Sequence, residues 1–116
     1  MTDDDCLFCR IIAGQVPSTE VYQDALCYAF EDINPQAPTH VQIIPRKHVA
    51  TLNDLVAEDE PMVGHLLTVA AAIARDRGIA ETGYRTVFNC NRAAGQSVYH
   101  IHLHVLGGRS LGWPPG

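Results

Sequence analysis

The sequence predicts an α+β fold with a five-stranded, mostly antiparallel sheet, one long helix and a short N-terminal helix. Two observations support this prediction. Short segments with the composition or alternation of strands are separated by turn residues, and one segment of about twenty residues has helical periodicity. The chain has 116 residues, of which 47% are apolar, so it can form one domain, residues 1–116, with a single modest core.

The first half of the chain contains the short helix and three of the strands. Gly14 and Pro17 are placed to end the helix. The Asp24-Ala25 pair lies between two weakly alternating segments, which predicts a hairpin. A proline-rich loop over residues 34–38 then precedes the third strand. The expected ranges are 7–13 for the helix and 20–23, 26–31 and 40–45 for the strands.

The second half contains the long helix and two more strands. Apolar residues recur at helical spacing over residues 58–77, and Gly78 is placed to cap the helix. A second face of this helix is also apolar, so we expect a partner subunit to cover it. The expected core face holds Val63, Leu66, Leu67, Ala70, Ile73 and Ala74, the second face holds Met62, Val69 and Ala72, and the strands cover 84–89 and 99–106.

Composition and charge exclude several classes of partner. The net charge is −5, from 13 acidic and 8 basic side chains without a basic run, which argues against binding a nucleic-acid duplex. The N-terminus is acidic where a secretory signal is basic, and the most apolar stretch, residues 66–74, is shorter than the about 20 residues that span a bilayer. We therefore expect a cytoplasmic protein with no membrane partner and with reduced cysteines.

Three histidines alternate with apolar residues in the predicted last strand, at His100, His102 and His104. Alternation along a strand places the three imidazoles on one face and the apolar side chains on the other. The ring nitrogens of buried imidazoles need hydrogen-bond partners, which a core without a functional site would have to supply. The pattern therefore indicates a functional site on one face of the sheet.

Two chemistries compete for this row. Same-face positions lie about 6.6 Å apart, so His100 and His104 would have Cα atoms about 13 Å apart. Because Zn–N bonds are only about 2.1 Å long, one zinc ion could not easily collect all three rings. Alternatively, the middle imidazole is a nucleophile toward phosphorus, with a backbone carbonyl holding the proton on its other nitrogen.

The spacing of these histidines resembles the signature of the histidine triad (HIT) superfamily of nucleotidyl hydrolases and transferases. Further segments resemble its Hint branch, namely residues 30–40, 44–48, 95–99, 106–109 and 113–116. The resemblance implies a homodimeric purine nucleoside phosphoramidase that cleaves the P–N bond of AMP-amine or GMP-amine conjugates and can hydrolyse aminoacyl-adenylates. The resemblance also implies that catalysis needs no cofactor.

The resemblance also implies roles for individual residues. His102 would be the nucleophile that forms a nucleotidyl-histidine intermediate, with His104 at the phosphate and His40 supporting the triad from the adjacent strand. Ser97 would give a proton to the leaving group. Asp32 would bind the ribose hydroxyls, Phe30 and Ile33 would wall the purine, and Asn89, Gly95 and Gln96 would lie at the phosphate.

A cysteine pair, Cys6 and Cys9, suggests a metal before it suggests redox chemistry, because cytoplasmic thiols stay reduced. Some HIT proteins resemble this chain in joining such a pair to the equivalents of His48 and His100 in a structural zinc site. The resemblance therefore implies that structural zinc is possible here. His100 would then serve both the triad and the metal.

Other interpretations remain open at this stage. The chain could be a purine nucleotide-binding or scaffolding module with incidental hydrolysis, a diadenosine polyphosphate hydrolase, or a zinc-dependent hydrolase.

In a homodimer, the sheets of two subunits would join into one larger sheet. Residues 111–116 would then lie near the partner's active site, where Trp113 would shape the choice of leaving group.

Overall fold

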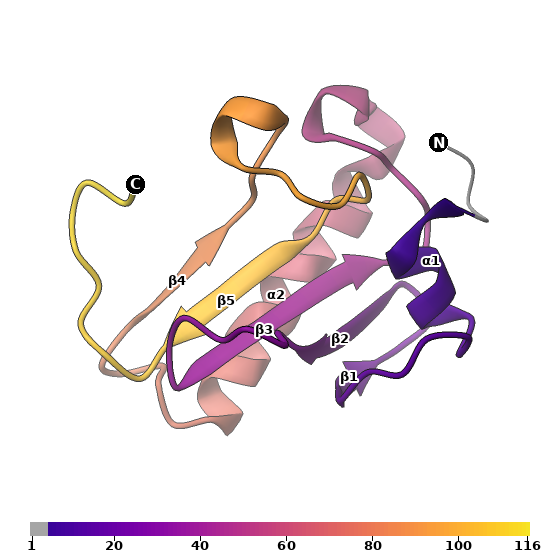
Figure 1. The fold of residues 1–116 in the computed structure, drawn as a ribbon. Coiled ribbons are helices and arrows are strands. Elements are labelled where there is room, and N and C mark those ends of the chain that lie inside the picture. The colour runs from indigo at the N-terminus through magenta and orange to yellow at the C-terminus, as the bar shows by residue number, and fades with distance from the viewer. Residues whose placement is uncertain (1–4) are drawn as a thin grey trace.

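The computed structural model describes residues 5–116 and shows an antiparallel five-stranded sheet with a long helix across one face (Figure 1). The strand order is β1-β2-β3-β5-β4, and every neighbouring pair is antiparallel. The predicted fold class is therefore confirmed. The helices are α1 (Leu7–Ile12) and α2 (Glu60–Asp76), and the strands are β1 (Glu20–Gln23), β2 (Cys27–Glu31), β3 (Thr39–Pro45), β4 (Tyr84–Val87) and β5 (Leu103–Gly107).

The main core lies between α2 and one face of the sheet. Period-2 alternation in the central strands β3 and β5 turns their branched side chains toward the helix. The apolar face of α2 packs against these side chains. The fully buried members include Val41 and Ile43 of β3, Leu103 and Val105 of β5, and Leu66 of α2.

A second cluster covers part of the opposite face, where α1 packs on β2 and β3. Phe8 of α1 is 4% exposed and makes an edge contact with Phe30, with ring centroids 5.5 Å apart. Cys6 caps this short helix, and its sulfur accepts a hydrogen bond from the backbone N–H of Cys9. Because α1 covers only one end of this face, the remainder is available for a site (Figure 1).

The buried face of α2 is wider than the predicted core face and includes two of the three residues of the second apolar face, whereas the third, Ala72, is exposed. Met62 is 9% and Val69 6% exposed, buried by the chain's own residues, whereas Leu67 of the expected core face is 46% exposed. The expectation that Met62 and Val69 need a partner subunit is therefore wrong. Residues 49–55 and Ile101 cover the first turns of α2 and bury Met62.

The fifth strand begins at Leu103 rather than at residue 99, so His100 and His102 precede the strand. The carbonyl of Pro45, where the ladder to β3 would continue, accepts a hydrogen bond from the ring of His100. The backbone N–H of Ile101 donates instead to Val49. The other element boundaries lie within two residues of the predicted ones, and short 3-10 turns occur at Leu52–Asp54, Ala57–Asp59 and Arg92–Ala94.

Among residues 5–116, no helix is long and apolar enough to span a bilayer. Asp3 and Asp4, two of the acidic residues that make a secretory signal unexpected, lie outside the described residues.

Candidate active site

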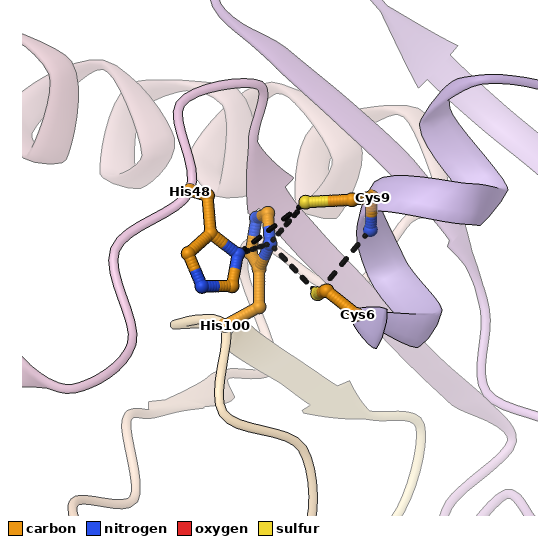
Figure 2. A group of neighbouring side chains, drawn as sticks. All are labelled: Cys6, Cys9, His48 and His100. Atoms are coloured by element: carbon orange, nitrogen blue, oxygen red, sulfur yellow. Dashed lines mark hydrogen bonds between the residues drawn. The ribbon is translucent and has the colours of Figure 1, made fainter. Parts of the chain in front are cut away.

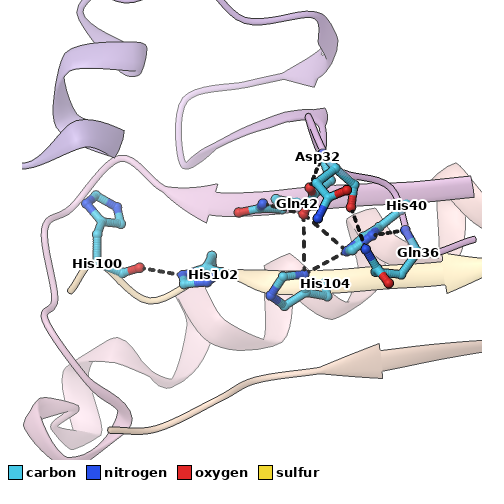
Figure 3. A network of polar contacts seen from close by, with 8 residues as sticks. Asp32, Gln36, His40, Gln42, His100, His102 and His104 are labelled. Carbon is cyan, nitrogen blue, oxygen red and sulfur yellow. Dashed lines mark hydrogen bonds and ion pairs between the residues drawn. The ribbon is translucent and has the colours of Figure 1, made fainter. Parts of the chain in front are cut away.

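The sheet face that α2 leaves uncovered carries a row of side chains across four strands. Directly paired residues of antiparallel strands point to the same face. Phe30 of β2 pairs with Gln42 of β3, which pairs with His104 of β5, which pairs with Val87 of β4. His104 thus lies in a row that crosses all four strands, and His102 precedes it on the chain (Figure 3).

His102 is held in one tautomer by the backbone. Its Nδ1 lies 2.8 Å from the carbonyl oxygen of His100, and because a carbonyl only accepts, Nδ1 must carry the proton. Burial lowers the pKa of His102, against the opposing effects of this hydrogen bond and of Asp32. The ring is therefore neutral at pH 7 and keeps a lone pair on Nε2. This is the state that a nucleophile toward phosphorus needs.

His104 is also neutral and lies beside His102, with ring centroids 5.0 Å apart. Burial first, and then His102 and His40, lower the pKa of His104 to about 4. Its Nδ1 lies 2.9 Å from Nε2 of His40, so the histidine of β3 supports the row from the neighbouring strand. The structure thus brings His40, His102 and His104 together.

Asp32 lies in the connection between β2 and β3 and approaches His40 and His104 (Figure 3). Its Oδ2 lies 3.3 Å from Nε2 of His40 and 4.0 Å from Nδ1 of His104. The same oxygen accepts a hydrogen bond of 2.7 Å from Nε2 of Gln42, and Oδ1 accepts one from the backbone N–H of Asn34. The carboxylate is therefore fixed beside the histidine row.

Gln42 is a site residue that the sequence reasoning missed. A signal was present, because Gln42 interrupts the apolar sequence Val41, Ile43 and Ile44 in a strand that is otherwise buried. Because Val41 and Ile43 on either side of it point into the core, alternation directs Gln42 to the uncovered face. The partner that it would contact there depends on the sheet register, which the sequence does not reveal.

The loop after β4 carries Gly95 and Gln96, expected at the phosphate, and Ser97, expected at the leaving group. Gln96 is buried, its Oε1 accepts from Asn91 N–H, and its Nε2 donates to the carbonyls of Ala50 and Val98. The backbone N–H groups of Gly95 and Gln96 donate to Arg92 and Asn91 within the loop. Gln96 therefore closes the loop on itself, and exposed Ser97 is the neighbour that it presents to solvent.

The remaining expected site residues are dispersed. Ile33 is 99% exposed, so within one chain it does not wall a pocket. Phe30 is buried and packs on Phe8 and Tyr28. Asn89 and Trp113 line the same cavity of about 620 Å³ between β4 and the C-terminal segment.

A second constellation lies at the start of the histidine row, where Cys6, Cys9, His48 and His100 converge (Figure 2). Nδ1 of His100 is 3.4 Å from the sulfur of Cys6 and 3.5 Å from that of Cys9. Nδ1 of His48 is 3.3 Å from the sulfur of Cys9 and 3.2 Å from Nδ1 of His100. The structure thus brings together all four residues of the expected metal set.

These four residues fit a tetrahedral zinc ion. With Zn–N near 2.1 Å and Zn–S near 2.3 Å, the corners of a tetrahedron lie about 3.4 Å apart for N–N and about 3.6 Å apart for N–S. The four measured distances are close to these values. His100 donates from Nε2 to the carbonyl of Pro45, so its Nδ1 lone pair faces the thiols. This second contact is the usual support of a ligating histidine.

The group Asp32, His40 and His104 also brings three possible ligand atoms together, but it does not fit a metal. A neutral histidine that ligates through Nε2 carries its proton on Nδ1. Nδ1 of His40 accepts a hydrogen bond of 3.0 Å from the backbone N–H of Gln36 and has no room for that proton. This hydrogen bond argues against the zinc-dependent hydrolase among the interpretations left open by the sequence.

The group Asp24, Cys27 and His65 is a poor metal set for a different reason. Burial, and then the charge of Asp24, raises the pKa of Cys27 to about 12, so its thiol keeps its proton. The carboxylate of Asp24 already accepts from Tyr22, from His65 and from two backbone N–H groups. These contacts account for the cluster without a ligand.

Comparison with known proteins gives a consistent result. The HIT domain family matches residues 13–111. The purine nucleoside phosphoramidase of Escherichia coli K12 is 55% identical over 109 residues, which cover 94% of this chain and 92% of that protein. A HIT-like protein of Synechococcus elongatus is 50% identical, over 97% of this chain and 98% of that one. The crystal structure of a HIT family hydrolase from Legionella pneumophila superposes with a TM-score of 0.95 at 53% identity, covering 97% of this chain and all of that one.

Proposed function

The chain belongs to the HIT domain family and is a hydrolase, and from this premise we propose that it cleaves the P–N bond of adenosine 5′-monophosphoramidates. The relative from Escherichia coli is a purine nucleoside phosphoramidase, which supports both the purine nucleotide and the P–N bond as the target. AMP-amine conjugates are the substrates that we expect first, and GMP conjugates are the alternative within the same class.

The observation that carries this proposal is the tautomer of His102. Its Nε2 lone pair attacks the phosphorus, the P–N bond breaks, and the amine leaves with a proton that we assign to Ser97 and, behind it, to solvent. Water then attacks the nucleotidyl-histidine, which releases AMP and returns the lone pair to Nε2. One water molecule is consumed in each cycle.

The other residues would bind and orient the nucleotide. His104 would donate to a phosphate oxygen, and the carboxylate of Asp32 would accept from the ribose hydroxyls. The Ser97 segment and Asn89 would border the phosphate, because Gln96 holds that loop against residue 50. Phe30 would border the purine from β2, since it is buried on the same face as Gln42 and His104, and Ile33 would reach the base only as an exposed rim.

Removal of the nucleophile tests this mechanism. We expect His102→Ala to lower the turnover of a fluorogenic adenosine phosphoramidate by several orders of magnitude while AMP still binds. His65→Ala, on α2 and outside the site, is the matched histidine control. Mass spectrometry should find the AMP adduct on His102 of the wild type. A variant that retained a tenth or more of the activity would refute the assignment, and AMP binding without any turnover in the wild type would favour a binding module.

A zinc ion in the Cys6, Cys9, His48 and His100 set is the second part of the proposal. The ion would fill all four positions with protein ligands, which supplies a structural cross-link and leaves no open position for water. It would tie α1 to the segment that carries His100 (Figure 2). Reduced thiols agree with the cytoplasmic location that the sequence predicts.

Elemental analysis of protein purified without chelator tests the metal, with about one zinc per chain as the expected result. Chelation should lower the melting temperature, and affinity should weaken below neutral pH because the thiols must lose their protons. Cys27→Ser changes a cysteine outside the set and should leave the zinc content intact. Zinc-free protein with a melting temperature unaltered by Cys9→Ser would contradict the site.

We also propose that two chains pair through β4, which is an edge strand of the sheet. Exposed edge strands offer unpaired backbone groups, and a second copy would extend the sheet. Trp113 is 84% exposed and lies near this edge, where a partner's leaving-group site could use it. Light scattering should then report about twice the 12.7 kDa of one chain, whereas a monomer at micromolar concentration would exclude this role for Trp113.

A further inference from the structure

His40 and His104, two histidines other than the proposed nucleophile His102, are linked to the backbone N–H of Gln36 by a continuous series of hydrogen bonds (Figure 3). The N–H of Gln36 lies 3.0 Å from Nδ1 of His40, and Nε2 of His40 lies 2.9 Å from Nδ1 of His104. We propose that the backbone N–H of Gln36 is a positioning group that fixes His104 as a permanent N–H donor through Nε2, so that His104 binds an oxygen of the ligand and does not relay a proton.

The first step is the protonation state of His40. A backbone amide can only donate, so Nδ1 of His40 must be the acceptor and carries no proton. The neutral ring of His40 then has its one proton on Nε2. That nitrogen faces Nδ1 of His104 at 2.9 Å and donates to it. Nδ1 of His104 is consequently a lone pair, and the proton of neutral His104 is on Nε2.

The Nε2 proton of His104 cannot be replaced through this series of hydrogen bonds. If His104 gave up its Nε2 proton, it would have to take a replacement at Nδ1 from His40. His40 could be replenished only at its own Nδ1, which faces the N–H of Gln36. A backbone amide does not act as an acid near neutral pH. The chain of hydrogen bonds therefore ends at a group that supplies no proton.

Gain of a second proton by His104 is opposed as well. It would place an N–H on Nδ1 facing the N–H of His40 at 2.9 Å. The groups that face the His104 ring are His40 on β3, His102 on the preceding segment and Asp32 on the β2–β3 connection. Asp32 alone favours the charged ring, and its Oδ2 is 4.0 Å away and already accepts from Gln42. The low pKa of His104, about 4, agrees with this balance.

The backbone on either side of the Gln36 N–H is itself held in place. The carbonyl of Gln36, in the peptide group that follows this N–H, accepts a hydrogen bond of 2.9 Å from Nε of Arg109, which follows β5. Asn34, two residues earlier, donates its backbone N–H to Asp32. The loop is thus anchored from both sides, so the N–H of Gln36 can keep its direction toward His40.

His104 and Ser97 would have separate roles in the proposed reaction. The tautomer of His104 does not depend on that reaction, and only the identity of the oxygen that His104 binds rests on it. A fixed N–H donor stabilises charge that develops on a phosphoryl oxygen without any reorganisation. The proton for the departing amine must then come from the side of the site that carries Ser97. The tautomer itself can be measured without substrate.

Nitrogen-15 NMR of the histidine-labelled full chain tests the assignment directly. At pH 7 the expected spectrum has Nδ1 unprotonated and Nε2 protonated for both His40 and His104, and the opposite state for His102. Protonated Nδ1 on His104, or a mixture of its two tautomers, would overturn the proposal. Because no turnover is involved, this result is independent of whether the chain cleaves phosphoramidates.

A backbone variant tests the cause. Gln36→Pro removes the N–H, whereas the control Gln36→Ala keeps it and removes only the side-chain bond to the carbonyl of Asn34. We expect mixed tautomers of His40 and His104 in Gln36→Pro and at least about a tenfold loss of turnover, since misaligned donors lose their advantage. The NMR signals of Gln36→Ala should match the wild type. A folded Gln36→Pro variant with wild-type His104 signals would refute the role of the N–H, and if that variant does not fold, the wild-type spectrum decides.

Discussion

The low pKa of His104 predicts a loss of stability in mild acid. Burial, with smaller effects from His102 and His40, holds the pKa of His104 at about 4 in the folded chain. An unfolded histidine titrates near pH 6.5, so below that pH the unfolded chain binds a proton that the folded chain does not. The corresponding stability is complete above pH 6.5 and is lost as the pH falls from 6.5 toward 4.

The size of the effect follows from these two values. At pH 5 the ring is almost fully protonated in the unfolded chain but only about one-tenth protonated in the folded chain. Each pKa unit corresponds to 1.36 kcal/mol, so the free energy of unfolding should fall by about 2 kcal/mol between pH 7 and pH 5 from this group alone. The side chain is 17% exposed, so solvent does little to screen the effect.

Urea unfolding at pH 7 and pH 5 measures this loss in the wild type and in His104→Gln, which carries no titratable ring. Other groups titrate in both proteins, so their contributions cancel when the two losses are subtracted. The wild type should lose about 2 kcal/mol more than the variant. Equal losses in the two proteins would refute the reasoning, because His104 would then titrate alike in the folded and unfolded chains.

Three further substitutions test the packing that positions the site. Phe8→Ala should lower the free energy of unfolding by about 3–4 kcal/mol in urea titrations, because its ring is buried against the histidine row, whereas Leu7→Ala, 44% exposed, should change it by less than about 0.5 kcal/mol. Gln96→Ala removes three hydrogen bonds that close its loop, so amide exchange there should accelerate by about tenfold or more while the global stability changes less. Gly108→Ala should cost about 1–3 kcal/mol, because φ is +92° and a Cβ would lie 2.9 Å from a proline side chain, whereas Gly64→Ala, with open space on α2, should stabilise by about 0.5–1 kcal/mol.

The elements could be predicted from the sequence because their signals are local. The alternation in β3 and the helical spacing of α2 each arise within a few residues and directly set which side chains are buried. The width of the buried face of α2 could not be predicted in this way. Met62 is buried by Val49 and Ile101, which are distant in the sequence, and only the tertiary fold brings them to the helix.

The start of β5 was mispredicted for a similar reason. Strand alternation continues back to residue 99, but a strand needs a partner, and the carbonyl of Pro45 is taken by the ring of His100, 55 residues away. The chemical identity of the site was predictable because the three histidines are adjacent in the sequence. The N–H of Gln36, to which we assign the tautomers of His40 and His104, carries no sequence signature of that role.

Different backbone carbonyls hold His100 and His102 in different tautomers. His100 donates from Nε2 to the carbonyl of Pro45, which leaves its Nδ1 lone pair facing the cysteines. His102 donates from Nδ1 to the carbonyl of His100, which leaves its Nε2 lone pair for the ligand. The two rings thus have opposite tautomers although they are two residues apart and identical in chemistry. The choice depends on which carbonyl each ring meets, so it is made by the path of the chain before β5 begins. If residues 99–102 had continued the ladder to β3, the Pro45 carbonyl would have been occupied by a backbone N–H, and the tautomer that suits His100 for a metal would have lost its support.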